Sequence, residues 1–179
     1  QRLYGVPGAA RIRGAHVVVV GIGGVGSWTA EALARSGVAR LTLIDMDHIA
    51  ESNVNRQIHA LTSTLGQSKA LAMQERIAQI HPACLVDVVD DFVGPDNWPA
   101  MLPGKPDAVI DACDDAKAKL ALAVWARQTR TPFVCVGAAG GKRLAHQVDV
   151  GDLAIATHDP LLARLRYQLR KHHGAPKEG

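Results

Sequence analysis

The chain has 179 residues, a length that suits one domain with a substantial core. Its 47% hydrophobic and 21% charged residues, with a formal net charge of +3, are typical of a soluble globular protein and do not require a nucleic-acid partner. Three cysteines without a Cys-x-x-Cys pair argue against a disulfide framework and a structural zinc site, and they favour the cytoplasm. No apolar run is long enough to span a membrane.

Residues 1–15 are predicted to form an N-terminal arm with a short helix. Four consecutive valines then predict a buried strand over 16–20, because β-branched residues favour strands that are covered on both faces. A G-x-G-x-x-G turn follows at Gly21, Gly23 and Gly26, and a helix is predicted to run from there to residue 36. This order favours nucleotide binding, since backbone N–H groups and the positive end of the helix dipole then meet at a phosphate.

A second strand is predicted over 41–44 and ends at Asp45, about 20 residues beyond the glycine turn. At this place a dinucleotide-binding fold puts an acid that binds a ribose hydroxyl, although a strand-end turn residue would look the same. The long polar connection over 46–66 favours a functional loop beside the nucleotide. A helix is predicted over 67–80, and Lys69 in its first turn needs an anionic partner unless it is simply solvated.

The rest of the chain continues the alternation of strands and helices. Strands are predicted over 85–89, 108–110 and 133–136, with a further one over 146–150, and helices over 116–128 and 159–173. The predicted fold class is therefore α/β: a Rossmann-like, doubly wound, mainly parallel sheet with helices on both faces, forming one domain over 1–179.

Ligands bind beyond the carboxyl ends of the strands in such a sheet. This edge collects the glycine turn, Asp45, Arg56, Lys69 and the acidic pair Asp111 and Asp114. Hydride transfer has no use for an arginine and a lysine opposite carboxylates, whereas phosphoryl or nucleotidyl transfer uses cations to stabilise phosphate charge and a carboxylate to hold Mg²⁺. Because no P-loop is present, we expect an ATP site on a dinucleotide-type fold, cut at the α-phosphate or at the β–γ bond.

The order and spacing of several motifs resemble the ThiF/MoeB/HesA-type family of ATP-dependent adenylating enzymes, over about residues 16–140. These motifs are Gly21–Ser27, Asp45-Met46-Asp47, Ser52–Gln57, Lys69 and Asp111–Asp114. Within the family the chain looks most like the branch of tRNA threonylcarbamoyladenosine dehydratases. That likeness comes from Arg2–Gly5, Val25–Trp28, Asn55–Leu61, Asp90–Val93, Ala139–Gly141 and Asp159–Leu161.

The resemblance implies an ATP-dependent enzyme that adenylates the threonyl carboxylate of N6-threonylcarbamoyladenosine in tRNA and then closes a ring with net loss of water. It also implies Mg²⁺, a cytoplasmic homodimer and a sulfur-relay protein as a candidate partner. Arg56, Lys69 and Asp114 would be catalytic, Asp114 would serve Mg²⁺, and Arg2 would reach across the dimer. The ATP-binding set would be Gly21, Gly23, Gly24, Gly26, Asp45, Asp47, Asn53, Asn55, Arg56, Gln57, Lys69 and Asp111. Of these, Asp111 is expected to act mainly as a structural acid at a strand end.

Other interpretations stay open at this stage. No cysteine follows Cys135, so the downstream catalytic cysteine of sulfur-carrier and ubiquitin activators has no counterpart, and Cys113 is expected to be a small buried residue. The first alternative function is adenylation of the C-terminal glycine of a ubiquitin-like sulfur carrier. The second alternative is a nucleotide-binding module without turnover. The polar segment 52–57 argues against a dehydrogenase. The basic helix over 159–173 is either a solvated face or a tRNA contact.

Overall fold

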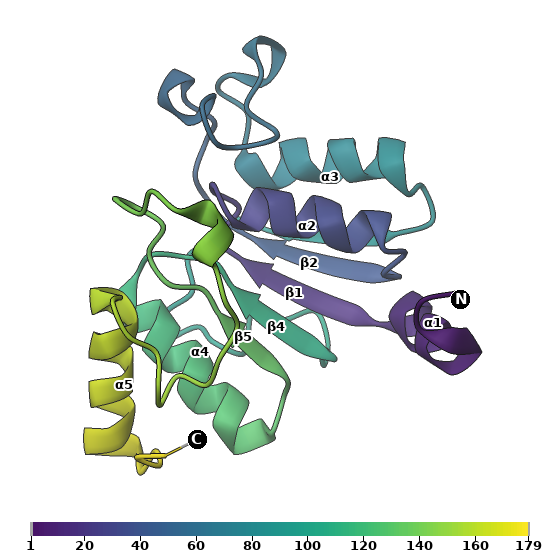
Figure 1. Cartoon of the computed structure of the whole chain (residues 1–179). Coiled ribbons are helices and arrows are strands. Elements are labelled where there is room, and N and C mark those ends of the chain that lie inside the picture. Colours follow the sequence, from purple (N-terminus) through teal and green to yellow (C-terminus); the bar gives the residue numbers. More distant parts are fainter. Residues whose placement is uncertain (1, 179) are drawn as a thin grey trace.

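A computed structural model describes residues 2–178 (Figure 1). Five strands form one sheet in the order β3-β2-β1-β4-β5, and every pair is parallel. The strands are β1 His16–Val20, β2 Arg40–Ile44, β3 Leu85–Val89, β4 Ala108–Asp111 and β5 Phe133–Cys135. The helices are α1 Gly5–Gly14, α2 Gly26–Arg35, α3 Lys69–Ile80, α4 Ala116–Thr129 and α5 Pro160–His173. Short 3-10 turns span Glu51–Asn53 (η1), Thr62–Thr64 (η2) and Ala145–Gln147 (η3).

Strand β1 lies in the middle of the sheet and is buried along its whole length. Its side chains alternate between the two faces, so Val17 and Val19 belong to one core and Val18 and Val20 to another. Helices α2 and α3 complete the first core, and α4 completes the second. The predicted doubly wound α/β fold is thereby confirmed.

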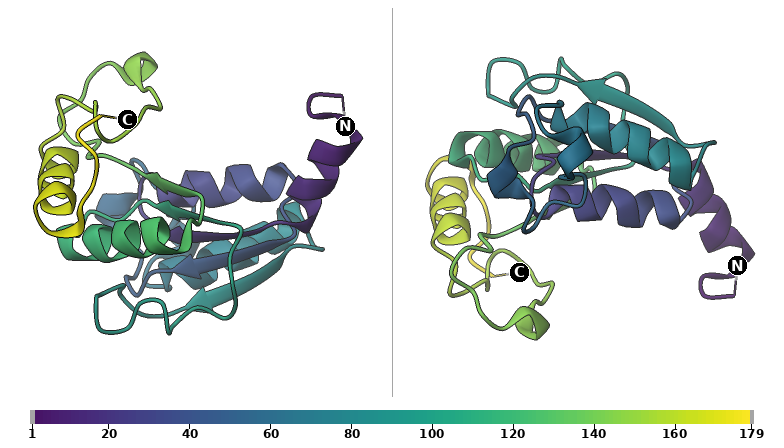
Figure 2. Two further views of the ribbon diagram at one scale, coloured as in Figure 1. Left: turned by 90° about the horizontal axis from the view of Figure 1, so that it is seen from below. Right: turned by 90° about the horizontal axis from the view of Figure 1, so that it is seen from above.

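Two helices lie outside this layered core. Helix α1 occupies most of the predicted N-terminal arm and leads into β1 at one end of the molecule (Figure 2). Helix α5 lies against α4 at the other end, where Leu165 and Leu169 pack on Ala123. No helix within residues 2–178 has the length and apolar character to cross a membrane.

The strand predicted over 146–150 is wrong. The chain forms η3 at Ala145–Gln147 and then continues without regular structure, and β5 is an edge strand that pairs only with β4. Val148 and Val150 of this segment are 82% and 87% exposed. A segment forms a stable strand only where one face is buried and a partner strand supplies hydrogen bonds, and this segment has neither.

The start of the helix predicted over 67–80 is shifted to Lys69. Ser68 is its N-cap, with the side-chain oxygen accepting from the N–H of Leu71 at 3.5 Å. The preceding residues extend alongside the loop that follows β2, where the N–H of Ile49 donates to the carbonyl of Gln67 at 2.8 Å. The hydrogen bond between Ile49 and Gln67 therefore brings the two ends of the polar connection together, between the end of β2 and the start of α3.

Candidate functional site

The loops after β1 and β4 meet at the carboxyl edge of the sheet, at the point where the strand order reverses. A side chain on Gly21, whose φ is +83°, would place its Cβ 2.8 Å from backbone atoms of Cys113. A Cβ on Gly26 would lie 1.7 Å from the carbonyl oxygen of Gly21. Only glycine fits these two positions, so close backbone packing fixes the glycine turn. In doubly wound sheets this reversal point is where ligands bind.

Asp45 holds the glycine turn against the end of β2. Its Oδ2 accepts from the N–H of Ile22 at 2.6 Å, and its Oδ1 accepts from the N–H of Asp47 at 2.8 Å. The residue is only 7% exposed. Each carboxylate oxygen has a second acceptor position, so these two bonds orient the group without using its whole capacity. The ribose contact predicted from the sequence stays a prediction, because the bonds seen here give Asp45 a role in holding the turn.

The loop before α3 is held against the glycine turn by several hydrogen bonds. Ser27 Oγ donates to the carbonyl of Gly23 at 2.6 Å and accepts from the N–H of Ile58 at 3.4 Å. His59 Nε2 bonds to the carbonyl of Ile22 at 2.8 Å. Burial lowers the pKa of His59, so the ring is neutral at pH 7. These contacts set the position of residues 53–57 relative to the turn.

Arg56 lies beside the glycine turn, with its side-chain carbons 3.4 Å from the place of a Cβ on Gly24. Its backbone carbonyl accepts from the indole N–H of Trp28 at 2.9 Å. The exposed guanidinium donates to the carbonyl of Ser52 at 2.8 Å and to Asn55 Oδ1 at 2.9 Å. Its cation is thus presented to solvent at the mouth of the predicted phosphate site.

Two further predicted residues lie inside the same loop. Asn53 is buried, and its Oδ1 accepts from the N–H of Ala50 at 3.0 Å, which closes the turn at η1. Gln57 is buried with its Nε2 3.8 Å from the place of a Cβ on Gly23, and its Oε1 has no hydrogen-bond partner within the described residues. A buried acceptor of this kind favours a ligand or water donor beside the turn.

Lys69 finds its anionic partner inside the chain. Its Nζ lies 2.7 Å from Asp47 Oδ2, and its N–H donates to the carbonyl of the same residue at 3.0 Å. The lysine side chain is 8% exposed and the aspartate side chain 55%. This pair holds the lysine at the end of β2, next to the glycine turn, and leaves the carboxylate partly in solvent.

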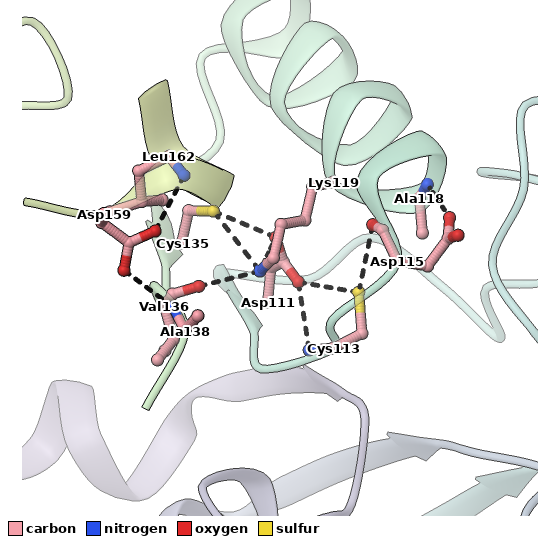
Figure 3. Close-up of polar contacts among 10 residues, drawn as sticks. All are labelled: Asp111, Cys113, Asp115, Ala118, Lys119, Cys135, Val136, Ala138, Asp159 and Leu162. Carbon is pink, nitrogen blue, oxygen red and sulfur yellow. Dashed lines mark hydrogen bonds and ion pairs between the residues drawn. The ribbon is translucent and has the colours of Figure 1, made fainter. Parts of the chain in front are cut away.

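Asp111 lies at the centre of a buried polar cluster (Figure 3). Its Oδ2 lies 3.1 Å from Lys119 Nζ, and neither side chain is exposed. Lys119 Nζ also donates to the carbonyl of Val136 at 2.9 Å. The thiols of Cys113 and Cys135 donate to Oδ1 and Oδ2 of Asp111 at 3.0 and 3.1 Å. Asp111 therefore joins β4, α4 and β5, as expected for a structural acid, and it is shielded from any ligand.

Burial and the negative charge of Asp111 keep both thiols protonated. Burial raises the pKa of Cys113 and that of Cys135, the latter to about 12, and the negative charge of Asp111 adds to the effect. Burial lowers the pKa of Lys119, but Asp111 outweighs it, and the net shift is upward. The lysine is therefore charged, and neither cysteine is a nucleophile at neutral pH.

The loop after Asp111 presents a second carboxylate to solvent. Asp115 is the N-cap of α4, where Oδ1 accepts from the N–H of Ala118 at 2.7 Å. Asp114, one residue earlier, is exposed. The buried cluster and the cap hold this loop from both sides, and Asp114 remains available at the same edge as the glycine turn.

Asp159 holds the loop after β5. Its Oδ1 accepts from the N–H of Leu162 and caps α5, while its Oδ2 accepts from the N–H of Ala138 at 2.9 Å and from Lys142 Nζ at 2.6 Å. The start of α5 is thereby fixed to the carboxyl edge of the sheet. Arg2, in contrast, precedes α1, and α1 leads into β1 at the amino ends of the strands, so one copy of the chain does not bring Arg2 to its own carboxyl edge.

Sequence reasoning missed three residues that shape the site: Ser27, Trp28 and Lys119. One signal was present for Lys119. It stands on the buried side of α4 with Leu122 and Ala126, and a lysine at a core position needs a buried acid. The bonds made by Ser27 and Trp28 depend on the path of the loop after β2, which follows from no local pattern.

The chain is similar to proteins of known activity. The ThiF family profile matches residues 1–153. A tRNA threonylcarbamoyladenosine dehydratase of Escherichia coli is 49% identical over 176 residues, 98% of this chain and 66% of that protein. The enzyme of the same name from Haemophilus influenzae is 45% identical over 172 residues, 96% of this chain and 66% of its own. The chain thus spans slightly less than two thirds of these relatives. A crystal structure of the E. coli enzyme in complex with ATP superposes with a TM-score of 0.93 at 50% identity, covering 97% of this chain and 71% of the other.

The buried pair gives a prediction about stability. Lys119→Met should lower the free energy of unfolding by about 3 kcal/mol or more, because Asp111 would remain charged and buried without its partner. The double variant Lys119→Met/Asp111→Asn should recover most of that loss, because it removes both charges. Urea denaturation measures these differences. Lys117→Met, at an exposed position of the same helix, is the matched control and should change stability by less than about 0.5 kcal/mol. Equal stability of Lys119→Met and the double variant would contradict a charge-based role for the pair.

Proposed function

The chain belongs to the ThiF family, and from that premise we propose that it catalyses ATP-dependent dehydration of N6-threonylcarbamoyladenosine in tRNA. The observation that carries the proposal is the 49% identity with a dehydratase acting on this substrate, which extends over 98% of the chain. The geometry supports it, because the loops that bear Asp45, Arg56, Lys69 and Asp114 lie at one edge of the sheet around a glycine turn.

The reaction has two bond-forming steps. In the first, an oxygen of the threonyl carboxylate attacks the α-phosphorus of ATP, and pyrophosphate leaves. In the second, the neighbouring carbamoyl group attacks the activated carbonyl carbon, a ring closes, and AMP leaves with the former carboxylate oxygen. The sum is loss of one water. Ring closure is intramolecular and gains from proximity, so no protein nucleophile is required, in agreement with the protonated thiols of Cys113 and Cys135.

The backbone of the glycine turn would bind the phosphates. Gly23 and Gly24 lie between the end of β1 and the start of α2, where N–H groups and the positive end of the helix dipole favour an anion. Gly21 and Gly26 give the turn its shape through their close contacts. Asp45 would bind the ribose from the end of β2, while Asn53, Asn55 and Gln57 would complete the ATP site from the loop that packs on the turn.

Two cations would offset the charge that develops on the phosphates. Arg56 reaches out from the loop against Gly24, and Lys69 stands at the end of β2 with Asp47. Preorganised cations of this kind stabilise the transition state more than the ground state. The bonds that Arg56 makes to Ser52 and Asn55 hold its guanidinium in place before ATP binds.

Asp114 would hold Mg²⁺ together with the phosphates. One exposed carboxylate at this edge fits the ion, because Mg²⁺ commonly takes only one or two protein carboxylates and completes its shell with phosphate oxygens and water. When bound, Mg²⁺ neutralises phosphate charge. The buried cluster below this loop and the helix cap beside it fix the backbone that would carry Asp114 to the ion.

We also propose a homodimer in which Arg2 reaches the partner's site. Leu3, Tyr4 and Val6 beside it are 80%, 63% and 66% exposed, an apolar surface that a second copy would cover. A cytoplasmic location and a sulfur-relay protein as a partner are carried over from the family resemblance as further proposals.

The proposed activity is tested by the products of ATP. We expect magnesium-dependent release of AMP and pyrophosphate, stimulated by tRNA that bears N6-threonylcarbamoyladenosine and not by tRNA that lacks it. The assay should include a ubiquitin-like carrier with a Gly-Gly tail as a competing acceptor. Stimulation by the carrier alone would establish the alternative function, and ATP binding without AMP release by any acceptor would indicate a binding module.

Arg56→Ala should lower turnover by about 100-fold or more, because it removes one of the two cations that face the phosphates. The fold should be unchanged, since this side chain is exposed and bonds only within its own loop. Steady-state AMP release and thermal unfolding measure the two effects. Arg35→Ala, at the far end of α2, is the control and should retain full turnover. Normal AMP release by Arg56→Ala would remove the assigned role.

A further inference from the structure

The outer face of α5 is strongly basic and bears no carboxylate. Over Pro160–His173 the helix has four arginines and lysines and no acidic residue. Surface helices usually mix both charges, since like charges one turn apart repel one another. Cations in the last turn are favoured by the helix dipole, but Arg164 lies in the second turn, where this explanation does not apply.

The cations of α5 fall into two groups. Arg166 donates to the carbonyls of Leu153 and Ala156. Arg170 donates to carbonyls of residues that precede α5 and of residues that follow it. These two arginines therefore attach the neighbouring segments of the chain to the helix. Arg164 and Lys171 are exposed and have no acidic partner within the described residues. Their charges are therefore available to a ligand.

The available cations flank an exposed aromatic ring. Tyr167 is 56% exposed, and Lys171 Nζ lies 5.6 Å from its ring centroid. Arg164, Tyr167 and Lys171 are spaced by three and four residues, which places them on one stripe of the helix, about 10 Å long. A shallow hollow adjoins this stripe and is lined by Ala163, Arg166, Tyr167, Arg170 and Lys171.

A polyanion that also carries aromatic bases is the ligand that this stripe fits best. Arginine and lysine bind phosphates, and an exposed tyrosine between them offers a face to a base. Tyr167 is the one large hydrophobic residue of α5 that is exposed, so the helix lacks the apolar face that membrane binding requires. These features favour nucleic acid over a lipid surface.

The stripe is linked to the candidate active site by Asp159. This residue caps α5 with one carboxylate oxygen and holds Ala138 and Lys142 of the loop after β5 with the other. Figure 2 shows α5 at the end of the molecule remote from the N-terminus, with one side against α4 and the other side free. The helix also begins beyond residue 153, where the match to the ThiF family ends. The exposed face of α5 is therefore a surface outside the part of the chain that matches the ThiF family profile.

We infer that Arg164, Tyr167 and Lys171 on the outer face of α5 form a binding surface for the RNA backbone that presents tRNA to the active edge of the sheet. The inference rests on the proposed action on tRNA. Phosphates would contact the two cations, and an unpaired base would stack on the tyrosine ring.

The double variant Arg164→Gln/Lys171→Gln tests this surface. Fluorescence anisotropy with labelled tRNA, measured over a series of salt concentrations, should show weaker binding and a plot of log K against log salt that is shallower by about 1.5, because two phosphate contacts are lost. KM for tRNA should rise about 10-fold at low salt, while KM for ATP stays unchanged. Tyr167→Ala should weaken tRNA binding by about 5-fold or more without changing the salt slope.

The matched control is Arg13→Gln/Lys105→Gln, which removes the same charge from exposed positions at the opposite edge of the sheet. Thermal unfolding should be similar for all variants. Unchanged tRNA affinity and salt slope in Arg164→Gln/Lys171→Gln, with normal turnover by the unaltered chain, would overturn the surface and leave the proposed function standing. Failure of the unaltered chain to bind tRNA would overturn both. If Arg164→Gln/Lys171→Gln lost binding to anionic phospholipid vesicles and kept its tRNA binding, the face would be assigned to a membrane instead.

Discussion

The close approach of two backbones at the middle of the sheet is the constraint on which the site depends. Gly21 passes so near Cys113 that no side chain fits between them, and Gly26 lies against the carbonyl of Gly21 in the same way. These contacts bring the turn after β1 and the loop after β4 together where the strand order reverses. Glycine thus allows the proposed phosphate-binding turn to approach the loop that carries Asp114, and the buried Lys119–Asp111 pair holds that loop from below.

Around this centre the chain uses buried charge to hold loops. Lys119 and Asp111 join the ends of β4 and β5 to α4, and Asp159 joins the loop after β5 to α5. A buried pair adds little to stability, but removing one partner is costly, so such a cluster favours a single arrangement of the loops that it contacts. Arg56 and Asp114 stay on the exposed side of these supports.

The sequence predicted most of the fold because its signals are local. The four valines identify β1, and apolar spacing identifies α2, α3 and α4 to within two residues. The strand predicted over 146–150 was wrong because a short local segment reveals nothing about a partner strand or a buried face. For the site, the sequence predicted the glycine turn from the spacing of its glycines and the position of Asp45 at the end of β2. The bonds from Trp28 to Arg56 and from Lys119 to Asp111 were not predicted, since they join segments whose approach follows from the folded chain.

Mass spectrometry of the nucleosides of tRNA after incubation with the chain, ATP and magnesium tests the proposed chemistry most directly. A site that adenylates the threonyl carboxylate and allows ring closure should convert N6-threonylcarbamoyladenosine to a product lighter by one water, and only when ATP is present. An unchanged nucleoside, under conditions in which ATP is consumed and tRNA is bound, would contradict the assignment of this site to tRNA dehydration.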